Sequence, residues 1–213
     1  MKKKSVFLNH STIALTNALR SSEIMEALAQ HGLDTEHIKF IQSQLRTVQR
    51  LEAQYSDGFA EAKAAPRLLH SVRNQAQQLY AQHVTLSRVA LKNQPVLLEK
   101  MDLNGRRKKT VADWMVQASR YYRHAATIKE QLAAFNITAR ELNEMHKLLN
   151  KMVELQTLQV ELKSQVQVIS EQRKEAYAAL QKSTSRFFRI ARIALESTPQ
   201  LLEALGLAVR ASV

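Results

Sequence analysis

Residues 88–103 have the sequence RVALKNQPVLLEKMDL, and residues 192–207 have the sequence RIALESTPQLLEALGL. Eight of these sixteen positions are identical, and both stretches place a proline shortly before a Leu-Leu-Glu triplet. The same shift of 104 residues, without a gap, aligns residues 24–29 with residues 128–133 through shared Ile, Glu, Leu and Ala. An internal repeat with one fixed spacing indicates a tandem duplication of a single structural unit.

The composition favours an all-α fold. The chain has 213 residues, of which 45% are hydrophobic, and this is enough for a substantial core. It has only four glycines and three prolines, too few for the many turns of an all-β fold or of a doubly wound sheet. We therefore predict two tandem repeats of an up-and-down helical bundle, residues 1–104 and 110–213, joined by a basic linker at residues 105–109.

A helix boundary is predicted at equivalent places in the two copies. Gly32 suits the left-handed position that follows a helix, and Asp34 or Thr35 can cap the next helix, with Asp34 accepting from the backbone N–H of His37. The second copy has Asn136 and Thr138 there, which are also residue types that favour a left-handed turn and a helix cap.

A long apolar stripe follows each predicted cap. Apolar residues recur every three or four positions for about sixty residues, which as a single helix would be about 90 Å long. The alternative is a hairpin at the midpoint, where the first copy has turn chemistry in Ser56-Asp57-Gly58 and Pro66, whereas the second copy has almost none. We favour the hairpin, because a first helix of about 23 residues cannot cover a partner of sixty. Each repeat then has three longer helices, or in the alternative one short and one very long helix, plus a short closing helix.

Each repeat closes with a proline and a leucine-rich helix. Proline is favoured at the first helical position, since its missing N–H is not needed there. We expect the leucines of these helices to be buried against their own bundles; they are Leu97, Leu98, Leu201 and Leu202.

These closing segments carry a family resemblance. The pattern Arg192-Ile193-Ala194-Leu195, followed by Pro199 to Leu207, resembles the C-terminus of an uncharacterised bacterial family of duplicated helical proteins. A similar leucine-rich helix followed by Gly105-Arg106-Arg107-Lys108-Lys109 ends the first repeat, so the similarity covers nearly the whole chain. The resemblance implies an all-α duplicated fold and no assigned activity.

The residues offer no catalytic constellation. The absence of cysteine excludes disulfides and thiol chemistry and fits a reducing compartment. The nearest match to the Glu-x-x-His pair of di-iron bundles is Asp34 with His37, and an Asp at a helix start is usually a cap. The four glycines are isolated, so no phosphate-binding loop is present. We expect no catalytic residue, no metal and no cofactor, and thus a protein that is not an enzyme.

The charge points to acidic partners. Lys and Arg exceed Asp and Glu by 31 to 19, a net charge of +12, and this favours an acidic protein, a nucleic acid or anionic lipid. Arg106, Arg107, Lys108 and Lys109 form the candidate anion-binding or partner-binding site. They precede a predicted N-cap at Thr110, where an anion would offset four cations beside the positive end of a helix dipole. Of the two interpretations we favour the other, an exposed linker that its charge keeps soluble, because salt can screen four charges in a linker.

A second basic stretch, Arg186-Phe187-Phe188-Arg189, could stack nucleic-acid bases on its aromatic rings. We favour core packing for these rings, because apolar residues continue the surface around them.

The sequence therefore predicts a non-enzymatic interaction or scaffold protein. One alternative is a nucleic-acid-binding protein that uses the linker and the basic second repeat, and another is a peripheral membrane protein with amphipathic helices. No apolar run approaches the roughly 18 residues that span a bilayer, and Lys2-Lys3-Lys4 is not followed by the apolar core of a signal peptide. We predict a cytoplasmic location.

Overall fold

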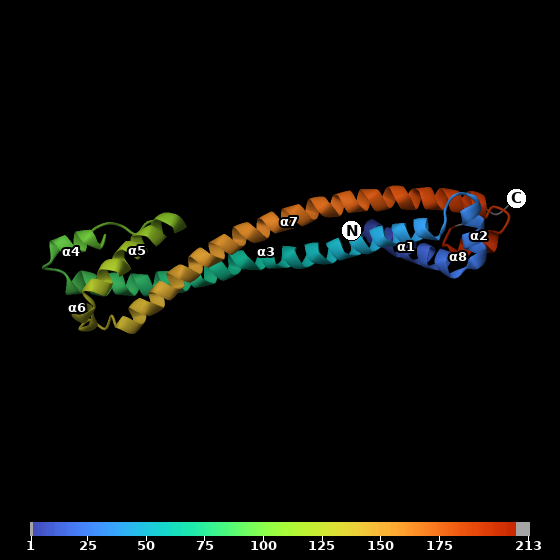
Figure 1. The fold of residues 1–213 in the computed structure, drawn as a ribbon. Helices are drawn as coiled ribbons and strands as arrows, with labels where there is room; N and C mark the ends of the chain where they lie inside the picture. Colours follow the sequence, from blue (N-terminus) through green and yellow to red (C-terminus); the bar gives the residue numbers. More distant parts are fainter. Residues whose placement is uncertain (1, 208–213) are drawn as a thin grey trace. The chain divides into compact units, whose positions relative to one another are not determined.

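The structure is a computed structural model that describes residues 2–207, with side chains from Lys4 onward. Residue 1 and residues 208–213, at the outer ends of the two predicted repeats, lie outside the described part. The described residues form helices and no strand, so the all-α prediction is confirmed (Figure 1). The helices are α1 (Lys2–Arg20), α2 (Ser22–Gln30), α3 (Thr35–Ala90), α4 (Pro95–Lys100), α5 (Val111–Thr127), α6 (Lys129–Ala133), α7 (Ala139–Ala194) and α8 (Pro199–Ala204).

The predicted midpoint hairpin is wrong, and each long stripe is one helix. Both α3 and α7 have 56 residues, and Pro66 lies inside α3. Gly58 lies inside α3 and forms no turn; a Cβ there would be in ordinary contact with Cγ2 of Val166 on α7, at 3.5 Å. The hairpin was favoured on the assumption that each repeat covers its own long helix. Instead, α3 and α7 cover each other, which removes the need for the chain to fold back.

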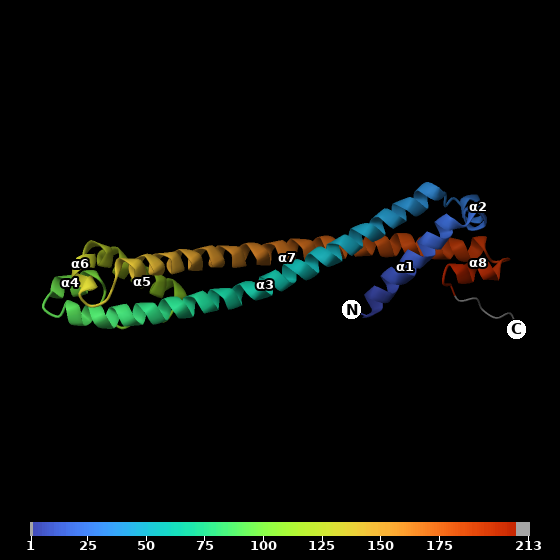
Figure 2. The same cartoon turned by 90° about the horizontal axis from the view of Figure 1, so that it is seen from below.

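Unit 1 contains the residues up to Phe59 and from Gln165 onward. The N-terminal part of α3 runs antiparallel to the C-terminal part of α7, since Glu52 pairs with Arg173 at 3.2 Å and Gly58 lies beside Val166. Figure 2 shows α1, α2 and α8 gathered around the C-terminal end of α7. The buried core joins residues of all these helices, among them Leu15, Leu28, Ile38, Leu45, Phe187, Ala191 and Leu202.

Unit 2 contains residues 60–164. Here α4, α5 and α6 gather around the C-terminal end of α3 (Figure 1), and the N-terminal part of α7 completes the core. This core is aromatic at its centre, where Tyr80, Trp114, Tyr121 and Tyr122 are at most 3% exposed. The ring of Tyr80 meets those of Trp114 and Tyr121 edge-on, with centroids 5.8 and 5.6 Å apart. Such edge-to-face pairs add stability beyond the burial of their surface.

The closing helix α8 packs against helices of the other sequence repeat. Leu202 is 8% exposed and lies in the same core as residues of α1 and α2. Asn17 on α1 donates to the backbone oxygen of Ala204 at 2.7 Å, and His10 lies 2.9 Å from that of Gly206. Burial of Leu202 is thus confirmed, in a core that combines α7 of its own repeat with α1, α2 and α3 of the first repeat rather than in a bundle of its own repeat alone. The other three closing leucines, Leu97, Leu98 and Leu201, are half-buried.

The two predicted turns have the expected backbone. Gly32 and Asn136 have φ of +76° and +61°, the left-handed conformation. The next residue in each turn donates back to the preceding helix, Leu33 to Leu28 at 3.0 Å and Ile137 to Leu132 at 3.2 Å. This is the Schellman pattern that ends a helix and turns an apolar residue into the core.

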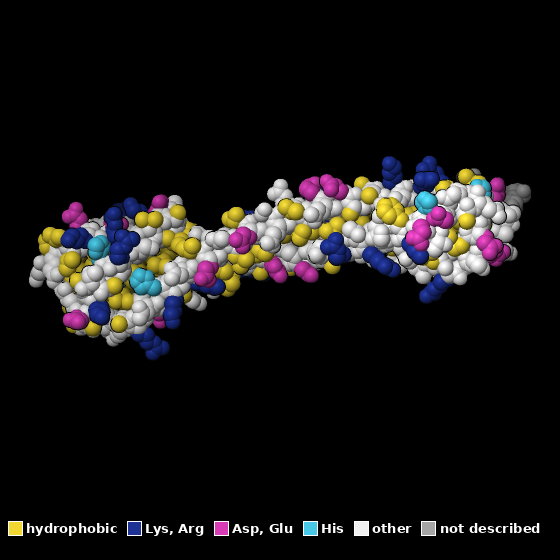
Figure 3. All heavy atoms as spheres, in the orientation of Figure 1, with side chains coloured by type: hydrophobic (Ala, Val, Ile, Leu, Met, Phe, Trp, Pro, Cys, Tyr) yellow, Lys and Arg dark blue, Asp and Glu magenta, His cyan; other side chains and the backbone are white. Residues whose placement is uncertain are grey.

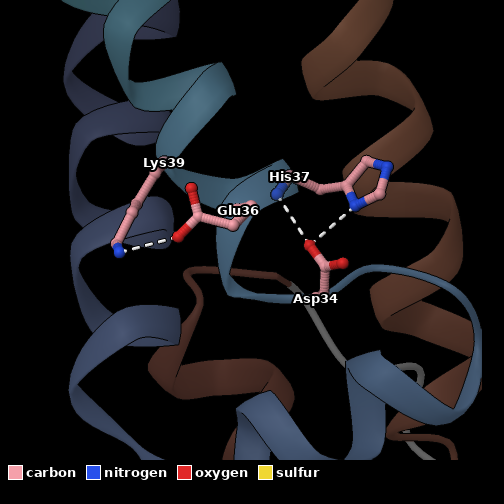
Figure 4. Close-up of polar contacts among 4 residues, drawn as sticks. All are labelled: Asp34, Glu36, His37 and Lys39. Atoms are coloured by element: carbon pink, nitrogen blue, oxygen red, sulfur yellow. Dashed lines mark hydrogen bonds and ion pairs between the residues drawn. The ribbon is translucent and has the colours of Figure 1, made fainter.

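The caps that start α3 and α7 also match the sequence. The backbone N–H of His37 donates to Oδ1 of Asp34 at 2.9 Å, and Nδ1 of His37 lies 2.7 Å from the same oxygen (Figure 4). These hydrogen bonds to His37 lower the pKa of Asp34. At the start of α7, Thr138 and Glu141 form a capping box, because the backbone N–H of each residue donates to the side chain of the other.

Candidate functional site: the basic pocket of unit 2

The basic segment 105–109 belongs to unit 2, where it forms the loop between α4 and α5. At the end of α4, Asp102 has a positive φ of 55°, and the backbone N–H of Leu103 donates to Leu98 at 2.8 Å. This turn buries Leu103, which is 2% exposed, and directs the following residues back over α3 and α5. A short polar side chain tolerates the left-handed conformation at Asp102 better than most residue types do.

Arg88 of α3 fixes the start of the loop. Its Nε donates to the backbone oxygen of Leu103 at 2.9 Å, and its Nη2 donates to that of Gly105 at 3.1 Å. In a helix or strand, backbone N–H groups would donate to these two carbonyl oxygens; in this loop the guanidinium of Arg88 donates to them instead.

Gln117 of α5 fixes the middle of the loop. Gln117 is only 4% exposed. Its Nε2 donates to Oδ2 of Asp102 at 3.0 Å and to the backbone oxygen of Arg106 at 3.4 Å. Its Oε1 accepts from the backbone N–H of Lys108 at 3.0 Å. One buried amide thus satisfies three groups of the loop, and the basic residues are held at defined positions.

The loop, α3 and α5 enclose a pocket of about 350 Å³. Its lining residues are Tyr80, Ala81, Val84, Thr85, Arg88, Asp102, Gly105, Arg106, Arg107 and Gln117. Figure 3 shows Lys and Arg side chains gathered at the edge of unit 2 where Figure 1 draws the loop between α4 and α5. We call this cavity the basic pocket.

The basic pocket has an excess of positive charge. Arg88, Arg106 and Arg107 contribute three cations against the single carboxylate of Asp102. Within residues 4–207, none of these arginines has a carboxylate oxygen within 4.0 Å. Their charges are therefore uncompensated by an ion pair and attract an anion to the pocket.

Tyr80 closes the pocket on its aromatic side. Tyr80 is only 3% exposed, and this burial raises the pKa of its phenol to about 12. Asp102, Arg88 and Arg107 line the same pocket as Tyr80, and their charges act on this pKa with effects smaller than that of burial. At neutral pH the hydroxyl keeps its proton and can donate a hydrogen bond.

The neighbouring buried groups belong to the core. The hydroxyl of Tyr121 lies 2.7 Å from Oγ of Ser87, and that of Tyr122 lies 2.9 Å from Nδ1 of His83. Nε2 of His83 has no hydrogen-bond partner, and burial lowers the pKa of this imidazole. His83 is therefore neutral in the folded protein near pH 7.

The four predicted site residues are all exposed, but the structure separates them. Arg106 and Arg107 line the basic pocket, whereas Lys108 lines a second hollow of about 460 Å³ with Asp113 and Arg120, and Lys109 lines neither. The predicted cap at Thr110 is confirmed, since its Oγ1 accepts from the backbone N–H of Asp113 at 3.2 Å. The carboxylate of Asp113 lies in the first turn of α5. This side chain, rather than a bound anion, is the acidic group beside the cations at the start of α5.

Three residues that shape the pocket and hold its loop were not predicted as site residues: Tyr80, Arg88 and Gln117. Tyr80 and Arg88 occur within the long stripe of α3, where neither differs from an ordinary helix residue. Gln117 did carry a signal, because it is an uncharged polar residue on the helix face that also holds Trp114, Ala118 and Tyr121. A polar side chain on an apolar face needs hydrogen-bond partners, and the loop supplies them here.

The second basic stretch forms part of the core of unit 1. Phe187 is fully buried and the half-buried ring of Phe188 stacks on His10 at 4.9 Å, so the prediction of core packing is confirmed. Arg186, Arg189 and Arg192 are exposed on α7.

The described residues form neither a metal-binding cluster nor a membrane-spanning helix. No cluster of three or more His, Cys, Asp or Glu residues there could hold a metal ion. No helix between residues 2 and 207 is long and apolar enough to cross a membrane.

In comparisons with known proteins, no family model, no curated protein and no solved structure matches the chain. The resemblance to a duplicated bacterial family stays a prediction.

Proposed function

We propose that this protein is a non-enzymatic helical interaction protein whose unit 2 binds an acidic partner through the loop 105–109. The observation that carries this proposal is the anchoring of the loop. Arg88 and Gln117 make three hydrogen bonds to the backbone of this loop and one to Leu103 shortly before it, while the side chains of residues 106–109 stay exposed. A fixed array of charges loses less conformational entropy on binding than a flexible one does.

We also propose that the architecture arose by duplication. The long helices have equal length and begin at Thr35 and Ala139, and the closing helices begin at Pro95 and Pro199. Both pairs differ by 104 residues, the spacing of the sequence repeat. The positive φ of Asp102 and of Gly206, also 104 residues apart, supports the same interpretation.

An acidic polypeptide fits the loop better than a nucleic acid. Asp102 and Asp113 interrupt the cations, which disfavours a continuous run of phosphates. The aromatic ring at the pocket, Tyr80, is buried and offers no free face on which a base could stack.

The test is a titration of labelled poly-glutamate and of a DNA duplex at about 0.15 M salt. The variant Arg106→Gln/Arg107→Gln/Lys108→Gln/Lys109→Gln should lose most of its affinity for poly-glutamate while its circular dichroism is unchanged. The matched control removes four exposed cations of α7 in unit 1, by Lys182→Gln/Arg186→Gln/Arg189→Gln/Arg192→Gln, and should retain binding. Equal losses in the two variants would refute the proposal, because binding would then depend only on net charge. Tighter binding of the duplex would favour a nucleic-acid partner instead.

A further inference from the structure

We propose that the basic pocket binds the phosphate group of a small molecule, with Arg106, Arg107 and Tyr80 as its direct donors. This inference goes beyond the proposed function, since it assigns a small-molecule ligand to the pocket beside the same loop. It rests on the geometry of the pocket, on its unpaired donors and on its size.

The arginines supply the charge. Nε and Nη2 of Arg88 donate to backbone oxygens, whereas the side chains of Arg106 and Arg107 make no hydrogen bond to any other described residue. A guanidinium presents planar paired donors that match two oxygens of a phosphate group. Two such groups lining one cavity fit a tetrahedral oxyanion with two negative charges, whereas a carboxylate would leave more of the positive charge uncompensated.

Tyr80 supplies a neutral donor. Its residue is 97% buried, and its hydroxyl makes no hydrogen bond within the described part of the chain, unlike those of Tyr121 and Tyr122. The hydroxyl oxygen is not fully covered by protein atoms, so it opens to the pocket that Tyr80 lines and is free to donate to a ligand oxygen there. The nearby carboxylate of Asp102 makes no hydrogen bond to this hydroxyl; its Oδ2 accepts from Gln117 instead.

The fold does not need these groups. The 104-residue shift places Thr184 opposite Tyr80 and Ile13 opposite Gln117. In unit 1 the hydroxyl of Thr184 bonds to the backbone oxygen of Leu180 on its own helix, and the unit still has a closed core. The hydroxyl of Tyr80 and the amide of Gln117 are therefore additions to the repeated unit, whereas Arg88 has an arginine, Arg192, at its equivalent position.

The size of the pocket restricts the ligand. A cavity of about 350 Å³ is at the lower end of small-molecule sites, which hold a phosphate with a compact organic part. The phosphate could come from the free ion or from a phosphomonoester, and both present the same oxyanion. Inorganic phosphate and glycerol 3-phosphate are the probes that distinguish these sources.

The experiment is isothermal titration of both probes into the full chain, in a buffer free of phosphate and sulfate. Tyr80→Phe removes only the unpaired hydroxyl and keeps the ring in the aromatic core, so the fold should be intact. We expect it to weaken probe binding about tenfold or more, the usual effect of one hydrogen bond to a charged group. The matched control is Tyr121→Phe, which removes a hydroxyl bonded to Ser87 and should leave probe binding unchanged while lowering stability.

A second pair of variants tests the arginines. Arg106→Gln/Arg107→Gln should abolish probe binding, and Lys108→Gln/Lys109→Gln should retain it. The proposal is overturned if neither probe binds saturably to the wild-type protein, or if Tyr80→Phe binds as tightly as the wild type does. Its failure is distinct from failure of the proposed function: poly-glutamate binding without probe binding would refute the pocket alone. Probe binding without poly-glutamate binding would refute the acidic partner alone.

Discussion

Replacing Leu202 with alanine tests the assignment of α8 to unit 1. Leu202 is 8% exposed and lies in a core shared with α1, α2 and both long helices. Replacing a buried leucine with alanine usually costs about 2–5 kcal/mol, because it loses apolar burial and leaves a cavity. A site in a helix of only six residues can relax, so we expect about 2–3 kcal/mol. For a protein of this size that is a fall in Tm of about 4–12 °C.

The assay is urea denaturation followed by circular dichroism, combined with amide hydrogen exchange. Exchange should accelerate in α1 and α2, which share the core with Leu202, and not in α5 and α6. Val96→Ala on α4 is the control, because Val96 is 62% exposed and a surface change costs within about 0.5 kcal/mol. An unchanged free energy of unfolding, or faster exchange confined to α5 and α6, would refute the packing described here.

Three further predictions follow from local chemistry. Burial lowers the pKa of His83 below 6.5, so this imidazole is protonated at a higher pH in the unfolded chain than in the folded protein. The free energy of unfolding, measured by urea titration, should therefore fall as the pH decreases below about 6.5. The pKa values of Tyr80 and Tyr121 are raised to about 12, so the absorbance of these phenols near 295 nm should change only near pH 12. The free energy of unfolding should fall as the pH rises above 10. Ionisation of both phenols near pH 10 would contradict their burial. Asn136→Gly should raise thermal stability and Asn136→Ala should lower it, because φ at this position is +61°; the reverse order would mean that the turn is not left-handed.

Local chemistry made the helix boundaries predictable. Gly32 and Asn136 differ in type, but each adopts the left-handed conformation, and Asp34 accepts from the backbone of His37 as expected. Such turns depend on a few adjacent residues, whose conformational preferences are visible in sequence. The core position of Phe187 was predictable for a similar reason, since apolar neighbours surround it at helical spacing.

The pairing of helices was not predictable from the same signals. An apolar stripe shows that a helix needs a cover but does not say which segment provides it. The turn chemistry of Gly58 and Pro66 favoured a local partner, whereas the actual partner is a helix more than a hundred residues away in sequence. The same limit applies to the site. Arg106 and Arg107 were visible as a charge run, but Tyr80 joins them only because α3 packs beside the loop.

Hydrogen exchange of the protein bound to poly-glutamate tests whether the acidic partner binds at the loop of unit 2, as we propose. We expect protection in residues 80–88 and 102–120, where the loop, Arg88 and Gln117 lie. We expect no protection along α7 at Arg186, Arg189 and Arg192, which are equally basic and exposed. Protection at those arginines, or protection spread evenly over all basic surfaces, would refute binding at the loop.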